Sequence, residues 1–223
     1  MHSTGKTYVS AAGRDWLLPF FDPFTKILGI RAFHKRLIDQ AAIIAGQRVL
    51  EIGSGTGNMT ILAKGMMPAA HFVGIDPDPK AVSRARRKAL RRRLAIQFDE
   101  GYSEQLPYHD ASFDRVLSAF MLHHVKPDAK ARTLREAFRV LKPGGSLHLA
   151  DFEETSRPAP GLHGLIASKL HSRHGSSPHH VVLNLMAATG FADCQEITRQ
   201  TTMMGRIVYY DALRPHSAVP TAA

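Results

Sequence analysis

A glycine-rich loop is the segment of this chain best suited to hold a ligand. Gly53, Gly55 and Gly57 alternate with other residues directly after an apolar run, Arg48–Ile52, and before a helix-forming stretch. Glycine accepts positive φ angles, and a turn of this kind lets a ligand approach the backbone where a helix begins. The loop therefore predicts a ligand site where a strand turns into a helix.

A carboxylate follows at the end of the next apolar run. Asp76 comes directly after the predicted strand His71–Ile75. In an open α/β sheet, ligands bind at the carboxyl ends of the strands, so the glycine loop and Asp76 are expected at the same edge. A carboxylate at this place suits the two hydroxyl groups of a ribose. Together the two features indicate a nucleoside-containing ligand.

The spacing of the glycines distinguishes between two cofactors. The dinucleotide fingerprint is Gly-x-Gly-x-x-Gly, and its loop receives a pyrophosphate. Here the pattern is Gly-x-Gly-x-Gly, and Glu51 stands just before it. A carboxylate would repel a pyrophosphate but attract the ammonium group of a methionine moiety. The charge therefore favours S-adenosylmethionine over NAD.

The elements that must position these residues alternate between strand and helix. Short apolar runs predict strands at Arg48–Ile52, His71–Ile75, Ala95–Phe98, Phe113–Ser118 and Ser146–Ala150. Between them, helices are predicted at Asn58–Lys64, from Pro79 onward, and at Ala129–Leu141. This alternation is typical of a parallel sheet with helices on both faces.

The last third of the chain is organised differently. A helix is predicted from about Pro178 to Thr189, and it is followed by strands at Ala192–Ile197 and Arg206–Ala212. No helix-length segment separates these two strands, and a parallel crossover needs a dozen or more residues. The two strands are therefore expected to pair antiparallel.

An amphipathic helix is predicted before the sheet. Apolar residues recur at a helical spacing at Phe33, Leu37, Ala41 and Ile44, and Gly46 is expected to end this helix. We therefore predict an N-terminal helical cap (1–45), a cofactor-binding core (46–154), a substrate-cap insertion (155–180), and a C-terminal helix and hairpin that complete the core (181–223).

Several motifs occur in an order that resembles the class I S-adenosylmethionine-dependent methyltransferases. They are Val49–Asn58, Val73–Pro79, Leu106–Asp114, Leu122–His124, Arg139–Gly145 and Thr189–Phe191. The chain is most similar to the group with the ubiquinone/menaquinone-biosynthesis C-methyltransferases and related small-molecule methyltransferases. The resemblance, over roughly residues 30–212, implies an α/β fold. This fold is a Rossmann-like three-layer sandwich with a seven-stranded, mostly parallel sheet and an antiparallel last strand.

The resemblance also implies roles for single residues. The cofactor would be bound by the loop and by residues after later strands: Glu51, Gly53, Ser54, Gly55, Gly57, Asp76, Pro77 and Ser118. Among these, Glu51 would lie near the ammonium group, Asp76 would bind the ribose, and Pro77 would flank the adenine. Ser118 would lie beside the methionine part and the substrate.

The adenine end departs from the family pattern. Relatives often carry an Asp after Phe98–Gly101, and here that position holds Tyr102. In one interpretation, Tyr102 packs on the adenine ring while the backbone N–H of Ser103 reads its edge. In the other, the segment aligns differently, and Asp99 or Glu100 is the partner of the adenine.

Two histidines are candidates for catalysis. Methyl transfer from a sulfonium requires mainly alignment of the reactants, and a general base is needed only where the acceptor loses a proton. His123 and His124 follow the fourth predicted strand, and Asp151 ends the fifth. Histidine can accept a proton near neutral pH. The alternative interpretation is that both histidines begin a helix and serve packing.

Histidines also gather in the segment between the core and the last helix, at His163, His171, His174, His179 and His180. This density suggests a metal site. However, no cysteine or carboxylate cluster accompanies them, and the transfer reaction requires no metal. We therefore predict a substrate-cap segment and no metal.

A run of basic residues marks the helix after Asp76, with Arg84, Arg86, Arg87, Lys88, Arg91, Arg92 and Arg93 expected to face outward. Its buried stripe is predicted to contain Ala81, Ala85, Ala89, Leu90 and Leu94. The net charge of +10 also favours anionic partners. Peripheral contact of Arg84–Arg93 with an anionic membrane is favoured over nucleic acid, because no RNA-binding module is recognisable. Oligomeric state is not indicated.

The single cysteine, Cys194, excludes an internal disulfide framework. No apolar run has the length of a signal peptide or a membrane span. We therefore expect a cytoplasmic protein, with attachment to the inner face of the membrane left open. The expected activity is methyl transfer to a small or lipid-like, apolar or aromatic acceptor. The alternatives are an RNA or protein methyltransferase and a non-catalytic S-adenosylmethionine-binding partner.

Overall fold

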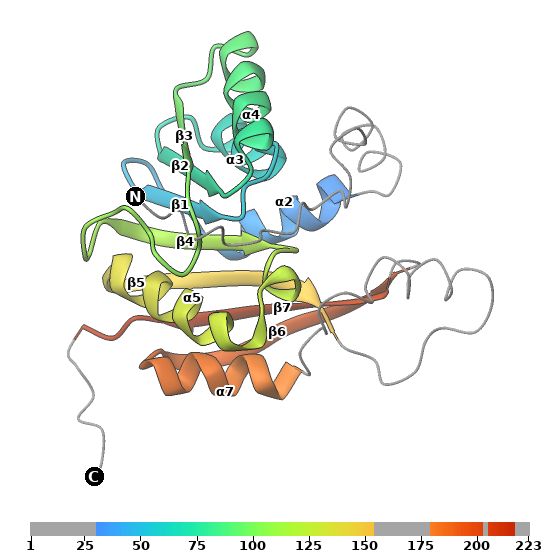
Figure 1. The fold of residues 1–223 in the computed structure, drawn as a ribbon, viewed down its shortest axis with the longest axis vertical. Coiled ribbons are helices and arrows are strands. Elements are labelled where there is room, and N and C mark those ends of the chain that lie inside the picture. The colour runs from blue at the N-terminus through green and yellow to red at the C-terminus, as the bar shows by residue number, and fades with distance from the viewer. Residues whose placement is uncertain (1–29, 154–178, 203–204, 217–223) are drawn as a thin grey trace, which may run out of the picture.

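The computed structural model describes residues 30–153, 179–202 and 205–216, and the structural statements below concern these residues. They form a sheet of seven strands in the order β3-β2-β1-β4-β5-β7-β6 (Figure 1). The strands are β1 (Arg48–Ile52), β2 (His71–Asp76), β3 (Ile96–Glu100), β4 (Phe113–Ala119), β5 (Leu141–Phe152), β6 (Ala192–Thr202) and β7 (Gly205–Leu213).

The strand directions match the expected fold. β1 to β5 are parallel to one another, and β7 runs antiparallel to both β5 and β6. The predicted Rossmann-like arrangement and the predicted antiparallel pairing of the last two strands are therefore confirmed. Since β1 to β5 are parallel, their carboxyl ends meet at one edge of the sheet.

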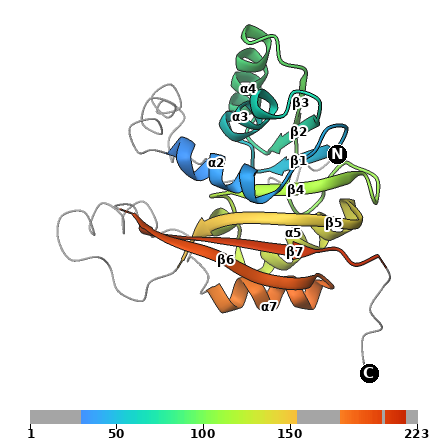
Figure 2. The same ribbon diagram turned by 180° about the vertical axis from the view of Figure 1, so that it is seen from behind.

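Helices cover both faces of the sheet. The helices are α2 (Ile30–Gln40), α3 (Asn58–Met66), α4 (Pro79–Arg91), α5 (Pro127–Val140) and α7 (His179–Thr189), and a short 3-10 helix, η2 (Leu122–His124), follows β4. Figure 1 shows α5 and α7 in front of the sheet, and Figure 2 shows α2 and α3 on the opposite face.

Two large apolar clusters hold the layers together. One contains Leu50, Val116 and Leu149 from the central strands with Leu134 of α5 and Met186 of α7. The other contains alternate residues of the same strands, packed against α2 and α3. The central strands are apolar on both faces because both faces are covered, as expected for parallel strands.

The first described helix is shorter than predicted. Phe33, Leu37 and Ala41 are buried, but α2 ends at Gln40 and the side chain of Ile44 is 61% exposed. Ala42 takes a positive φ of 43°, so the backbone leaves the helix before it reaches Ile44. The prediction that Gly46 ends this helix and that Ile44 belongs to its buried face is therefore wrong.

The basic helix α4 also differs in detail from the prediction. Ala81, Val82, Ala85 and Ala89 face the sheet, whereas the side chain of Leu90 is 78% exposed. Leu90 lies one position, about 100°, around the helix from Ala89, which turns it out of the buried stripe. Its assignment to that stripe is corrected.

Two of the basic residues of α4 bind within the molecule. Arg86 donates to the carbonyl oxygen of Phe98, with a distance of 2.9 Å from Nε. Lys88 donates to the side-chain oxygens of Asn58, at 2.5 Å, and Thr56, at 3.2 Å. Arg86 is nevertheless exposed, as predicted, whereas Lys88 is only partly exposed, so the expectation that all seven basic residues face outward is corrected for Lys88.

Some expectations fall on residues that are not described. Most of the N-terminal cap lies outside the described residues, and so does most of the predicted substrate-cap insertion, with His163, His171 and His174. The domain boundaries consequently stay predictions. Within the described part of the chain, no helix has the length and apolar character needed to cross a membrane.

Candidate cofactor and catalytic site

The glycine loop lies at the carboxyl edge of the sheet, between β1 and α3. Gly53, Gly55 and Gly57 have φ angles of 76°, 50° and 75°. The backbone N–H groups of Gly53 and Ser54 donate to the carbonyl oxygen of Ile75, at 2.9 and 3.0 Å, and this fixes the loop against the end of β2. The loop thus has the strand-to-helix position that the sequence predicted.

Gly57 shows why this loop needs glycine. A Cβ atom added to Gly57 would lie 2.7 Å from the Phe98 ring and 2.9 Å from Cβ of Ala85, so α3, α4 and β3 meet here without space for a side chain. At Gly55, in contrast, an added Cβ would meet no atom within 4 Å. The loop is packed on its inner side and open at Gly55, where a ligand can reach the backbone.

Asp76 is held in place by the loop and by the start of α4. Its Oδ2 accepts the backbone N–H of Gly55 at 2.8 Å, and its Oδ1 accepts that of Asp78 at 3.0 Å. Each carboxylate oxygen retains capacity for a further donor. Burial raises the pKa of Asp76, and the two backbone donors offset part of this effect. The geometry is compatible with two ribose hydroxyls, and that role stays a prediction.

Glu51 lies beneath the loop. Its carboxyl is 5% exposed and accepts a hydrogen bond from the hydroxyl group of Thr60 on α3. Burial raises the pKa of Glu51 to about 8, against the hydrogen bonds from Thr60 and the charge of Lys88. A buried carboxyl of this kind is compatible with a cationic ligand group, because the ligand would supply the missing counter-charge.

The other predicted loop residues include one unsatisfied polar atom. Within the described residues, the buried side-chain oxygen of Ser54 has no hydrogen-bond partner, so this loop can accept a further polar group. Ser118 is buried, and its hydroxyl donates to the carbonyl oxygen of Ile52 at 3.1 Å. Ser118 therefore ties β4 to the base of the loop, and its contact with a ligand stays a prediction. With Asp76 and Glu51, these features fit S-adenosylmethionine.

The segment after β3 supplies the residues expected at the adenine. Tyr102 is half-buried, and the hydroxyl groups of Ser103 and Thr133 on α5 lie 2.8 Å apart. Asp99, one of the alternative adenine partners, accepts hydrogen bonds from the Tyr108 hydroxyl at 2.9 Å and from Gln97 at 2.7 Å. Both bonds reach Oδ2 of Asp99. Pro77 follows Asp76 at the same edge, where it is half-buried. These adenine contacts stay predictions.

His123 and Asp151 form a close pair at the ends of β4 and β5. The Nδ1 atom of His123 lies 2.5 Å from Oδ1 of Asp151, and the backbone N–H of His123 donates to Oδ2 at 2.9 Å. Burial alone would raise the pKa of Asp151. The charge and hydrogen bond of His123 and two backbone donors outweigh this effect and lower it. If Nδ1 carries the proton of this bond, Nε2 presents its lone pair.

Aromatic rings surround this pair. Phe120, directly after β4, has a φ of 56°, a left-handed conformation that is unusual for a bulky residue and is often found at functional sites. Its ring lies 5.2 Å from that of Phe152 and 6.3 Å from that of Phe33 on α2. The ring of His124 lies 3.9 Å from that of His123.

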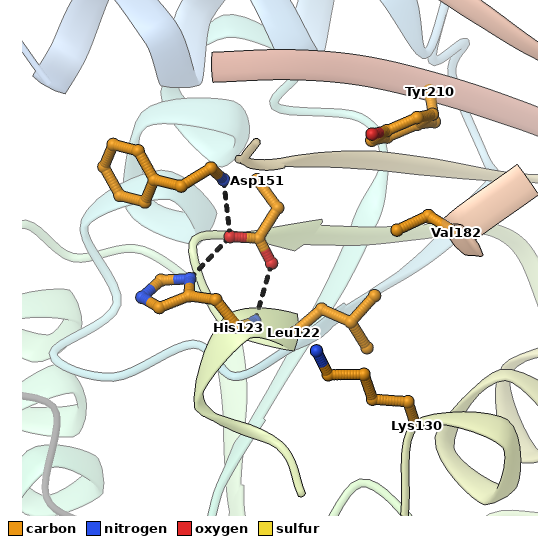
Figure 3. Close-up of a pocket in the computed structure, with 7 residues that line it drawn as sticks. Leu122, His123, Lys130, Asp151, Val182 and Tyr210 are labelled. Atoms are coloured by element: carbon orange, nitrogen blue, oxygen red, sulfur yellow. Dashed lines mark hydrogen bonds and ion pairs between the residues drawn. The ribbon is translucent and has the colours of Figure 1, made fainter. Parts of the chain in front are cut away.

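A small pocket lies beside Asp151 (Figure 3). It is lined by Leu122, His123, Lys130, Asp151, Phe152, Val182 and Tyr210, and its cavity volume of about 10 Å³ suits a single water molecule. Lys130 and Tyr210 are pocket residues that were not predicted from the sequence. Lys130 could have been found, because it shares a helical face with the buried residues Leu134 and Ala137. For Tyr210 no such signal exists.

A metal site is not found among the residues that the structure describes, where no three His, Cys, Asp or Glu residues are grouped to bind an ion. Of the predicted histidine-rich segment, only His179 and His180 belong to a described element, as the first residues of α7. The role of this segment stays a prediction.

The chain is similar to known methyltransferases. Residues 49–145 match the family model of the methyltransferase domain. The demethylmenaquinone methyltransferase of Deinococcus radiodurans is 35% identical over 153 residues, covering 67% of this chain and 61% of that protein. The enzyme of the same name from Thermus thermophilus is 35% identical over 149 residues, covering 66% of this chain and 67% of that protein. The chain thus matches about two thirds or less of the length of these relatives.

The fold is likewise shared with a solved structure. Phosphoethanolamine N-methyltransferase 2 of Haemonchus contortus, in complex with S-adenosyl-L-methionine, aligns with a TM-score of 0.71 at 14% identity, covering 82% of this chain and 52% of that one. At this identity the similarity concerns the fold alone. Together, the glycine loop with Asp76, the seven-stranded sheet and the sequence matches show that the chain belongs to the S-adenosylmethionine-dependent methyltransferase family.

Proposed function

We propose that this protein transfers a methyl group from S-adenosylmethionine to a small, apolar or aromatic acceptor that loses a proton in the reaction. The observation that carries this proposal is the His123–Asp151 pair at the carboxyl edge of the sheet. An acceptor without an acidic proton would need no base there. The proposed acceptors are therefore phenols, enols and activated carbon atoms.

The roles of the residues follow from their places. Bound S-adenosylmethionine supplies a methyl group on a sulfonium, whose carbon–sulfur bond breaks with both electrons going to sulfur. The acceptor atom forms the new bond to the methyl carbon, and its proton goes to Nε2 of His123. Asp151 holds the ring by Nδ1 and stabilises its positive charge. The glycine loop aligns the methyl donor, which is the main contribution of such an enzyme.

The surroundings of the pair support an apolar acceptor. Phe120 and Phe152 present partly buried aromatic rings beside His123, and Phe33 extends this wall onto α2. Flat aromatic acceptors pack well against such surfaces. The relatives named demethylmenaquinone methyltransferase agree with this class. A naphthoquinol of this type is the first acceptor to test.

The experiment is transfer of labelled methyl groups by the purified full chain. Label is expected in a reduced demethylmenaquinone analogue or in a small-molecule or lipid fraction. His123→Gln and Asp151→Asn should each lower kcat by about 100-fold or more with unchanged affinity for S-adenosylmethionine. His124→Gln is the matched control, with nearly normal kcat expected.

Other outcomes identify the competing functions. Label found only in RNA or protein would replace the small acceptor by a macromolecule. Binding of S-adenosylmethionine without transfer to any fraction would indicate a non-catalytic partner protein. Equal loss of kcat in the His123 and His124 variants would contradict the assignment of the base.

We also propose peripheral association with anionic membranes through α4. Arg87, Arg91, Arg92 and Arg93 are exposed at one end of this helix or directly after it, and the exposed side chain of Leu90 lies among them. Each basic residue near an anionic bilayer contributes about 1 kcal/mol of attraction. An apolar side chain between the arginines adds a group that the interface can bury.

A further inference from the structure

We propose that Lys88 of α4 is a positioning residue for the methyl donor: its side chain holds the glycine loop in the shape that binds S-adenosylmethionine, and its charge acts on the carboxyl group of Glu51 beneath that loop. The inference concerns the methyl donor and does not depend on which acceptor the protein uses. It can therefore be tested without an acceptor.

The contacts of Lys88 are the first observation. Its Nζ atom donates to Oδ1 of Asn58 at 2.5 Å and to Oγ1 of Thr56 at 3.2 Å. These two residues stand directly before and after Gly57, the third glycine of the loop. Both views of the ribbon show α4 beside α3 (Figures 1 and 2). A single side chain of α4 thus bonds to both flanks of Gly57.

The start of α3 is the second observation. Gly57 is the N-cap residue of this helix, and because it has no side chain it supplies no capping hydrogen bond. Its φ of 75° is left-handed, and the side chain of Thr56 before it is buried. The shape of such a turn depends on what holds the residues on each side of it. The ammonium group of Lys88 has three donors and can bond to both residues at once.

The charge of Lys88 also reaches the carboxyl group beneath the loop. Burial is the main cause that raises the pKa of Glu51 to about 8, and the charge of Asp76 on β2 adds to it. The hydrogen bonds from Thr60 on α3 and the charge of Lys88 on α4 act in the opposite direction. Lys88 therefore helps Glu51 to ionise, which is the form that attracts a cationic group of the cofactor.

The place of Lys88 on α4 separates it from the proposed membrane surface. Lys88 lies between Ala85 and Ala89, which face the sheet, and it is only partly exposed. Arg87 and Arg91 are exposed. Substitution of Lys88 consequently tests the loop and leaves the outward-facing arginines in place.

The first measurement is calorimetric titration of the full chain with S-adenosylmethionine at pH 7. Lys88→Met should weaken binding about tenfold, because two hydrogen bonds from a charged donor to the loop are lost. Lys88→Arg keeps a charged donor and should recover part of the affinity. Arg135→Met removes the same charge from an exposed position on α5 and should leave the affinity unchanged.

The second measurement reports the charge of Lys88 and not its packing. It is an NMR titration of the Glu51 carboxyl carbon in the 13C-labelled full chain without cofactor, with Glu51→Gln used for assignment. The midpoint is expected at about pH 8 in the unmodified chain. Lys88→Met should move it upward by about 0.5 pH units, because a cation that favours the ionised form is removed. Lys88→Arg and Arg135→Met should leave it in place.

A packing role for Lys88 gives a different result. Weaker binding by Lys88→Met with an unchanged Glu51 midpoint would overturn the inference, and so would unchanged binding. Lys88→Gln is the second uncharged variant if Lys88→Met does not fold, and the same upward shift is expected. If both measurements agree with the inference but no acceptor is methylated, the proposed acceptor class is wrong and the role of Lys88 stands.

Discussion

The carboxyl group of Glu51 combines deep burial with a position directly before the glycine loop. Burial raises its pKa to about 8, so at neutral pH the unliganded protein holds most of this carboxyl in the protonated form. A cationic ligand group beside it would favour the ionised form. Binding of S-adenosylmethionine, if its ammonium lies there, is therefore coupled to the release of a proton.

This coupling gives a measurable prediction. Between about pH 6 and pH 8, the affinity for S-adenosylmethionine should rise with pH, because each step toward the raised pKa reduces the work of removing the proton. Titration calorimetry in two buffers of different ionisation enthalpy should show proton release at pH 7. Glu51→Gln should abolish that release and weaken binding. An equal release in both proteins would contradict the placement of the ammonium at Glu51.

The same residue affects folding. The pKa of Glu51 is higher in the folded protein than its usual value of 4.5, so the folded state retains a proton that the unfolded state loses. The contribution of Glu51 to stability therefore declines as pH rises from about 4.5 to 8. In urea denaturation, the Glu51→Gln protein should gain stability relative to the unmodified chain over this range. A difference that is constant with pH would argue against the raised pKa.

At the level of elements, the packing of α3 against α4 and β3 depends on Gly57. Gly57→Ala places a methyl group against Phe98 and Ala85 in a backbone conformation with φ of 75°. We expect a loss of about 1–3 kcal/mol in the free energy of unfolding, from overpacking and strain. The measurement is urea denaturation.

Gly65 offers the matched control within the same helix. It lies on the exposed side of α3, and an added Cβ would meet no atom within 4 Å. Gly65→Ala should therefore stabilise the protein by about 0.5–1 kcal/mol, since alanine favours the helix. Equal effects of the two substitutions would show that Gly57 is not constrained by packing.

The elements near the site could be predicted because their residues are local in the sequence. β1 has the predicted bounds, since a charged residue precedes its apolar run and glycine follows it. β6 was predicted to end at Ile197 but continues to Thr202. Its last residues are mostly polar and alternate in exposure, as suits an edge strand, and only pairing with β7 reveals them as strand. The prediction that Leu90 is buried was wrong, because its position around the helix, and not its apolar side chain, determines its exposure.

In the candidate site, too, some features could be predicted from the sequence and others could not. The loop, Asp76 and the two histidines could be placed at one edge, because each follows a predicted strand. The contact between His123 and Asp151 could not be derived, since it depends on the conformation of the chain at Phe120 and η2. The partners of Ser103 and Ser118 likewise come from elements far away in the sequence.

At the scale of the whole molecule, the charge of α4 predicts salt-dependent lipid binding. Replacement of Arg87, Arg91, Arg92 and Arg93 by Gln should weaken binding to vesicles that contain phosphatidylglycerol by 100-fold or more at low salt, at about 1 kcal/mol for each residue. Leu90→Ser should weaken binding at low and high salt alike. Cosedimentation with vesicles measures both effects.

The control is a variant that loses four positive charges outside α4. Arg31, Lys126, Arg132 and Arg135 are exposed and lie outside α4. Their replacement by Gln should reduce vesicle binding much less than the α4 variant. Equal loss in the two proteins would show that net charge, not α4, is responsible. Competition by RNA at equal charge would favour nucleic acid as the partner.

The reversed direction of β7 also determines how the molecule can be attached to a support. β7 runs against the parallel strands, so it ends at the edge opposite the glycine loop and His123. There Arg214 exchanges backbone hydrogen bonds with Gly144 and Gly145, each at 2.8 Å, and its side chain binds carbonyl oxygens at the end of α5. A tether that continues from this point would hold the protein with its ligand-binding edge directed away from a sensor surface. Immobilised in this way, the chain should keep the affinity for S-adenosylmethionine that it has in solution.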